Sequence, residues 1–171
     1  MINIIKNVLL VILFCFKATI ASSETIKKID IIGNERISDE TIIMFSNISK
    51  NQIINNSDLN SILMDLYETN FFKDVKVRYD GGVLTINVIE NPIIYNIKFE
   101  GLKSKSLTKV LSENINLKER SSYIEAIVAK DKDKIRSILR NAGYFFSEVS
   151  ILKEDVGENK LNLIINIELG K

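Results

Sequence analysis

The residues best suited to chemistry are three carboxylates, Glu125, Asp131 and Asp133, which stand close together in the sequence. Two carboxylic acids that face each other across a cleft can act as acid and base in hydrolysis. Here the acids alternate with lysines at positions 130, 132 and 134, and such mixing of charges is typical of a solvated helix face with local ion pairs. We therefore interpret the segment as solvated surface.

The residue types that most often bind metals or attack substrates are nearly absent. The sequence has no histidine, and its one cysteine is Cys15, close to the N-terminus. Gly33, Gly101 and Gly143 lie outside any glycine-rich loop, so we interpret them as turn and cap residues rather than phosphate-binding residues. We expect a protein that is not an enzyme, with no catalytic residue, no metal site and no cofactor.

The N-terminus has the layout of an export signal. Lys6 precedes the apolar run 8–16, and Thr19 and Ala21 are small residues at the spacing of a cleavage site. The run is much shorter than the roughly 20 residues that a membrane-spanning helix requires. We predict a secretory signal peptide at residues 1–21; an uncleaved anchor is the alternative, because Lys17 lies close to the apolar run.

Charge argues against nucleic acid as a partner. Without residues 1–21 the chain would carry 21 basic and 22 acidic residues, since Lys6 and Lys17 are removed from the 23 basic ones. Nucleic-acid binding depends on a clustered basic surface, which this balance does not suggest. Cys15 would be removed as well, so stability would depend on packing without disulfides.

The remainder of the sequence contains an internal repeat, which favours two modules at 24–91 and 92–171. Residues 26–42 parallel residues 94–110, each a strand pattern followed by a glycine and a polar helix start. Residues 66–77 parallel residues 139–151 with one extra residue, and both units end in an apolar strand pattern. Each unit therefore has the order strand, helix, helix, strand, strand.

The expected helices have apolar stripes that would build a core. From Ser57 as cap, apolar residues recur at helical spacing through Tyr67. In the second unit, Ser122 and Glu125 form a candidate capping box, and a long apolar face follows that is interrupted by Asp131.

The strand patterns alternate between apolar and polar residues, which predicts a sheet with one buried face and one wet face. Residues 80–82 (DGG) suit a tight hairpin turn. The helical crossover from the first strand is best satisfied when that strand pairs parallel to the last one, which makes the last strand central. We predict an α+β fold of two tandem β-α-α-β-β modules, each a three-stranded mixed sheet covered on one face by two helices.

In this topology the first and second strands of each module are both edges, and an edge strand can pair with an extended peptide. Lys76 and Arg78 on an edge are also a common protection against aggregation, and both interpretations stay open. If the Lys76 N–H points outward, proline at that position should impair peptide binding and leave the fold intact. The candidate peptide-binding residues are Val75, Lys76, Val77, Arg78, Tyr79, Val149, Ser150, Ile151 and Leu152.

The junction between the modules contains the only proline, Pro92, which fixes its own φ and favours an extended Asn91. We interpret Glu90, Asn91 and Pro92 as a short and restrained inter-domain hinge.

Together these segments resemble tandem POTRA domains of the outer-membrane assembly protein BamA and its relatives. The resemblance covers residues 25–171 and corresponds to the first two of the five modules typical of that family. Further modules and the C-terminal membrane barrel are missing, so we expect a fragment or truncated reading frame. The segments that carry the resemblance are IDIIGNERISDETI (29–42), LYETNFFKDVKV (66–77), VIENPIIYNIKFEG (88–101) and LRNAGYFFSEV (139–149).

The resemblance implies a scaffold at the periplasmic face of the outer membrane. Its partners would be unfolded outer-membrane β-barrel proteins, held by β-augmentation, and accessory lipoproteins of the assembly complex. Attachment to the outer membrane would be through the barrel that is absent from this chain. The alternatives within the family are the POTRA region of a two-partner-secretion transporter, which captures one exported protein, and an FtsQ-type cell-division scaffold.

Overall fold

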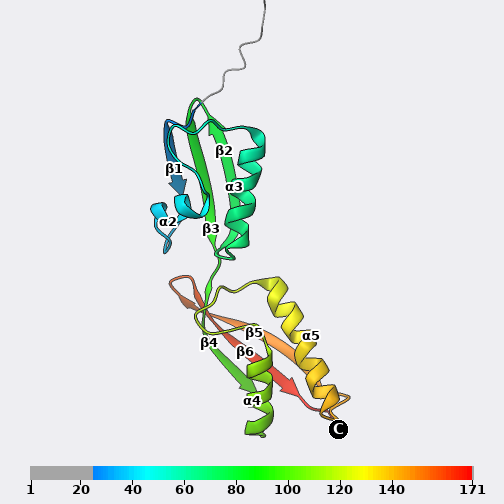
Figure 1. The fold of residues 1–171 in the computed structure, drawn as a ribbon. Helices are drawn as coiled ribbons and strands as arrows, with labels where there is room; N and C mark the ends of the chain where they lie inside the picture. Colours follow the sequence, from blue (N-terminus) through cyan, green and yellow to red (C-terminus); the bar gives the residue numbers. More distant parts are fainter. Residues whose placement is uncertain (1–24, 171) are drawn as a thin grey trace, which may run out of the picture.

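The computed structural model describes residues 25–170, which form two similar units that follow one another end to end (Figure 1). The predicted signal peptide at residues 1–21 lies outside the described residues. Within residues 25–170, no helix is both long enough and apolar enough to cross a membrane.

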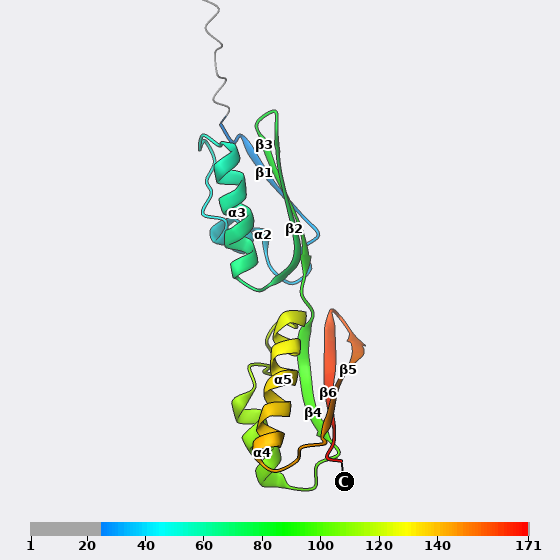
Figure 2. The same cartoon turned by 90° about the vertical axis from the view of Figure 1, so that its right-hand side faces the viewer.

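The first unit contains three strands and two helices. In chain order these are β1 (Lys28–Ile32), α2 (Asp39–Phe45), α3 (Asn56–Glu68), β2 (Phe72–Asp80) and β3 (Val83–Glu90). The second unit repeats the order with β4 (Ile93–Glu100), α4 (Lys105–Asn114), α5 (Glu125–Asn141), β5 (Glu148–Gly157) and β6 (Lys160–Glu168). In each unit both helices lie on the same face of the sheet (Figure 2).

The two sheets have the predicted topology. Their strand orders are β1-β3-β2 and β4-β6-β5. In each unit the last strand of the chain order lies in the centre of the sheet. The first strand pairs with it in parallel and the second strand in antiparallel orientation. The α+β fold of two mixed three-stranded sheets with helices is therefore confirmed, and its cause is the helical crossover between the first two strands.

Each unit has its own core between its sheet and its helices. In the first unit Ile42, Leu66 and Ile86 are fully buried, and in the second Leu111, Leu139 and Leu163 are. The alternation of apolar and polar residues along β3 and β6 places their apolar side chains against the helices. Two separate cores explain why the repeat in the sequence corresponds to two structural units.

A glycine closes the first strand of each unit at the same place. Gly33 and Gly101 both have positive φ, and a Cβ on them would lie 2.3 Å from the Val88 carbonyl oxygen and 1.9 Å from that of Ile167. Only glycine allows this approach of the loop to the central strand. Their interpretation as turn residues agrees with this geometry.

Two expected helix caps are wrong. The α3 N-cap is Asn55, which forms a capping box with Asp58, so the cap lies two residues before Ser57. The α5 N-cap is Ile124, whose side chain makes no cap hydrogen bond. Glu125 is the first residue of α5 and not its third, so it does not complete a capping box; its carboxylate instead accepts a 2.6 Å hydrogen bond from the Tyr123 hydroxyl.

Candidate functional site: the exposed sheet edges

The predicted peptide-binding residues lie on edge strands. Val75–Tyr79 belong to β2, which pairs only with β3, and Val149–Leu152 belong to β5, which pairs only with β6. Among residues 25–170, no strand pairs with the outer side of either β2 or β5. Each edge therefore presents every second backbone N–H and C=O group away from its own sheet.

The outward residues of β2 can be assigned from the hydrogen bonds. The Val75 N–H donates to the Tyr67 hydroxyl at 3.2 Å, so it points away from β3. Because the direction alternates along a strand, Val77 and Tyr79 also present their backbone groups outward, whereas Lys76 and Arg78 bond to β3. The hypothesis of an outward Lys76 N–H is therefore wrong, and proline at position 76 would break the sheet itself.

The same assignment can be made for β5 from the other side of its sheet. The Ile93 N–H of β4 donates to the carbonyl of Asn159, the residue before β6, at 2.9 Å. Because the direction of backbone groups alternates along a strand, the backbone N–H and C=O groups of the odd-numbered residues of β6 also point towards β4. The even-numbered residues of β6 then bond to their β5 partners, such as Ser150 and Leu152. Val149, Ile151 and Lys153 therefore present their backbone groups outward.

The two edges differ in what covers them. At β2, the Tyr67 hydroxyl accepts from Val75 and donates to the Asp74 carboxylate at 3.3 Å. The outer-face cations of β2 are paired within the strand, Lys76 with Asp74 at 3.4 Å and Arg78 with Asp80 at 3.3 Å. The start of β2 is therefore closed by a side chain of α3, and its charges are balanced locally.

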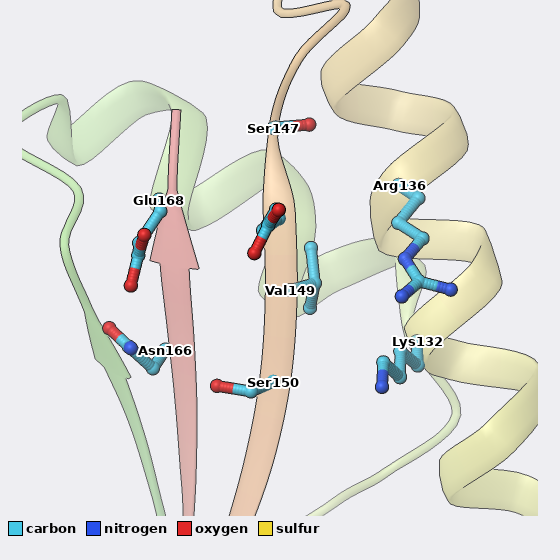
Figure 3. Close-up of a pocket in the computed structure, with 8 residues that line it drawn as sticks. Lys132, Arg136, Ser147, Val149, Ser150, Asn166 and Glu168 are labelled. Atoms are coloured by element: carbon cyan, nitrogen blue, oxygen red, sulfur yellow. The ribbon is translucent and has the colours of Figure 1, made fainter. Parts of the chain in front are cut away.

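At β5, by contrast, a cavity of ≈ 440 Å³ lies beside the strand (Figure 3). From α5, Lys132 and Arg136 extend into the space between the helix and β5 (Figure 3). The remaining lining residues come from β5, from the residue before it and from β6: Ser147, Glu148, Val149, Ser150, Asn166 and Glu168. The structure thus places the predicted Val149 and Ser150 in this cavity beside two basic residues.

Lys132 and Arg136 were not among the predicted site residues. The sequence does contain a signal for them, since Lys132, Arg136 and Arg140 recur at every fourth position and therefore share one face of α5. What the sequence alone does not show is that this face lies beside the β5 edge.

The three carboxylates Glu125, Asp131 and Asp133 lie in different environments. Asp131 is fully buried, so its interpretation as solvated surface is wrong. Its carboxylate accepts hydrogen bonds from the backbone N–H groups of Asn116 and Leu117, both at 2.7 Å, and from the Asn116 amide at 2.8 Å. Asp133 is exposed and pairs with Arg136 at 3.3 Å. Among the described residues there is no cluster of three potential metal ligands of the His, Cys, Asp or Glu type.

At the junction, only Asn91 and Pro92 separate β3 from β4. Glu90 lies at the end of β3, and its buried side chain is anchored in the first unit. One carboxylate oxygen accepts the backbone N–H groups of Glu35, Arg36 and Ile37 at 2.9–3.0 Å, and the other lies 3.3 Å from the Arg36 guanidinium. Burial favours the neutral acid, but these hydrogen bonds and the Arg36 charge outweigh burial and lower the Glu90 pKa.

The junction is also held by contacts between the units. The Asn159 amide donates to the Glu90 carbonyl at 3.4 Å. The Asn91 N–H and amide donate back to Phe71 and Asn70 of the first unit at 2.8 and 3.0 Å. The Asn159 bond places the β5–β6 turn against the end of β3, and the Asn91 bonds fix the linker to the first unit.

A small polar cluster lies beside this junction in the second unit. Lys153 is 3.5 Å from the Glu125 carboxylate and 5.0 Å from the centre of the Tyr123 ring. Burial and the hydrogen bond to Glu125 together raise the pKa of Tyr123, so this phenol stays protonated and donates to the carboxylate. The cluster lines a cavity of ≈ 340 Å³ that also includes Lys73 and Glu90 of the first unit.

Comparison with known proteins identifies a repeated family match. The POTRA family, described as surface antigen variable number repeat, matches residues 24–91 and again residues 92–170. The sequence is 21% identical over 159 residues to the outer membrane protein assembly factor BamA of Neorickettsia risticii, covering 92% of this chain and 20% of that protein. It is 24% identical over 150 residues to BamA of Neisseria meningitidis, covering 86% of this chain and 19% of that protein.

The chain thus spans about one fifth of the length of these curated relatives. Among solved structures, the N-terminal domain of Omp85 from Thermosynechococcus elongatus superimposes with a TM-score of 0.51 at 14% identity. The match covers 82% of this chain and 61% of that one, and it supports the same fold.

Proposed function

Because the chain belongs to the POTRA family, whose model it matches twice, we propose that it is a periplasmic scaffold for the assembly of outer-membrane β-barrel proteins. In this role it holds unfolded barrel polypeptides by adding their extended segments to a sheet edge. The similarity to two proteins named as outer membrane protein assembly factors supports a role in outer-membrane protein assembly. The mode of binding is argued from the edge strands.

The observation that carries the proposal is the open edge of β5. Val149, Ile151 and Lys153 present backbone groups outward, and the cavity of ≈ 440 Å³ leaves room beside their strand. Backbone pairing makes few demands on the sequence of the added strand, which suits a protein that handles many different barrels. We therefore assign peptide binding primarily to Val149–Leu152 of β5, and secondarily to Val75–Tyr79 of β2, where Tyr67 restricts access.

The junction residues Glu90, Asn91 and Pro92 are proposed to restrain the two modules rather than to let them move independently. Two linker residues and the contacts of Asn91 and Asn159 limit the available motion. A restrained junction would keep the β5 edge in a constant position for a client. Accessory lipoproteins of the assembly complex are proposed as further partners, with surfaces outside the β5 edge available to them.

Backbone N-methylation of a bound peptide tests strand addition without altering the protein. In an added strand, alternate N–H groups pair with β5 and the others point away. We expect peptides from the last strand of an outer-membrane barrel to lose binding when N-methylated at residues of one parity and to keep it when methylated at the other. Fluorescence anisotropy measures the affinity of the chain for each of the two sets of methylated peptides. Equal effects at both parities would contradict strand addition.

The identity of the client is tested separately. Peptides from several unrelated barrel proteins should compete for the same site, since backbone pairing dominates. Binding restricted to one exported protein would contradict the assembly role and favour a two-partner-secretion transporter.

A further inference from the structure

The β5 edge differs from a neutral strand-binding edge because α5 places two cations beside it. Lys132 and Arg136 extend from α5 into the cavity next to Val149 (Figure 3). We propose that this groove binds many extended segments but prefers those that carry two carboxylates at positions i and i+2, both on the side facing α5. The inference rests on the proposed addition of a strand to β5 and names the chemistry of that strand.

The direction of side chains in an added strand follows from the sheet. Side chains alternate between the two faces, so every second residue of the added strand points to the face that bears α5. On β5 itself, the side chain of Val149 points to the face that bears α5 and is buried against the core. A strand added outside β5 therefore places every second side chain in the space that Lys132 and Arg136 enter.

The spacing of the two cations matches the spacing of a strand. Lys132 and Arg136 are four residues apart on α5, which is about 6 Å along the helix axis. Residues i and i+2 of a strand are about 6.6 Å apart. Two acidic residues at i and i+2 can thus each meet one cation, whereas adjacent acids cannot, because they point to opposite faces.

The two cations are available to such a ligand. Within residues 25–170, Lys132 forms no ion pair, and the one ion pair of Arg136 is an exposed contact with Asp133 at 3.3 Å. Glu148 and Glu168 line the same cavity, but neither is within ion-pair distance of Lys132 or Arg136. Carboxylates of an added strand would supply negative charge opposite Lys132 and Arg136, on the side of the cavity that α5 forms.

The first module shows that this basic wall is not a general feature of the repeat. When Leu66 is aligned with Leu139, the positions of Lys132 and Arg136 correspond to Leu59 and Leu63. The next position on the same face of α3 is Tyr67, whose hydroxyl accepts the hydrogen bond of the Val75 N–H. A charge-selective edge is therefore expected at β5 and not at β2.

The test compares three versions of one β-strand peptide that differ only at positions i and i+2. These carry two aspartates, two asparagines or two lysines. We expect the aspartate peptide to bind roughly three- to tenfold more tightly than the asparagine peptide, as two solvent-screened ion pairs would give. The lysine peptide should bind most weakly, and added salt should reduce the differences.

A matched pair of protein variants locates the effect. Lys132→Glu with Arg136→Glu should reverse the preference, so that the lysine peptide binds best. Lys130→Glu with Lys134→Glu makes the same charge change at the same spacing on the other side of α5, and it should leave the preference intact. Circular dichroism and a urea titration show that both variants fold.

The outcomes separate this inference from the proposed function. If all three peptides bind equally and N-methylation still shows a parity effect, the charge selection is overturned and strand addition stands. If the control variant loses the preference as fully as the test variant, the assignment to Lys132 and Arg136 is overturned. If no peptide binds, the proposed function is overturned, and the inference with it.

Discussion

The Tyr67 hydroxyl accepts the Val75 N–H at 3.2 Å, and this hydrogen bond makes the β2 edge different from the β5 edge. It occupies one outward N–H of β2 with a side chain from α3. The corresponding part of β5 instead borders a cavity that Lys132 and Arg136 enter from α5. Two modules of the same fold thus differ at their second strands, since the β2 edge is restricted and the β5 edge is open.

Replacing Tyr67 with phenylalanine should open the β2 edge. The Val75 N–H would lose its partner and exchange faster with solvent, and the chain should lose about 1 kcal/mol of stability, the usual net contribution of one hydrogen bond. Hydrogen exchange at Val75 and urea unfolding measure the two effects. Tyr95→Phe is the control, since Tyr95 is 64% exposed. Unchanged exchange at Val75 would show that Tyr67 does not close the edge.

The Glu90 carboxylate should make stability depend on pH. Its pKa is lowered in the folded chain, because the hydrogen bonds from Ile37, Arg36 and Glu35 and the Arg36 charge outweigh the burial that raises it. Its contribution is therefore complete above the unfolded-state pKa of a glutamate, about 4.3, and is lost as pH falls through the lower folded-state pKa.

Glu90→Gln measures this contribution. The variant should be less stable than the parent chain at neutral pH by roughly 2 kcal/mol, because the charge-assisted bonds are weakened. The gap should narrow as the pH falls below about 4. Urea unfolding across this pH range gives both curves. A gap that stays constant with pH would contradict the assigned role of the carboxylate.

Asp131 should be essential to the second module, whereas the neighbouring Asp133 should not. Asp131→Ala leaves the N–H groups of Asn116 and Leu117 without their acceptor in a buried site, so we expect a loss of about 3 kcal/mol. Asp133→Ala removes an exposed ion pair and should cost under about 1 kcal/mol. Equal losses in urea unfolding would mean that the buried carboxylate does not hold this loop.

Gly101 should tolerate no side chain, because a Cβ would clash with the Ile167 carbonyl, and Gly143 serves as a control without such a clash. Gly101 and Gly143 both have positive φ, but a Cβ would lie 1.9 Å from the Ile167 carbonyl only at Gly101, and nothing lies within 4 Å at Gly143. Gly143→Ala should cost about 1 kcal/mol through φ alone, and Gly101→Ala clearly more. The difference between their melting temperatures measures the steric part, and similar values would contradict the close approach.

Much of the fold follows from patterns that are local in the sequence. The alternation along β3 and β6 indicates strands with one buried face. The helical crossover after β1 then determines which strand is central. The repeat of residues 26–42 at 94–110 similarly indicates two modules. These features depend on neighbouring residues and on chain connectivity, so one sequence suffices.

The errors concern contacts between distant residues. In the sequence Asp131 belongs to a charge run that is typical of solvated surface, yet it shares a helix face with Ile135 and Leu139, and the loop at Asn116 donates hydrogen bonds to its carboxylate. Its position on the core face was readable from helical spacing, but its hydrogen-bond partners were not. Likewise, the spacing of Lys132 and Arg136 was visible, and their position beside β5 depends on how α5 packs.

Hydrogen exchange at β5 tests the central claim most directly. With a saturating barrel-strand peptide, the outward N–H groups of Val149, Ile151 and Lys153 should become protected, while those of Lys76 and Arg78, already bonded to β3, should not change. Peptide binding that leaves Val149, Ile151 and Lys153 exchanging as fast as before would show that the client is held elsewhere, and would contradict the account.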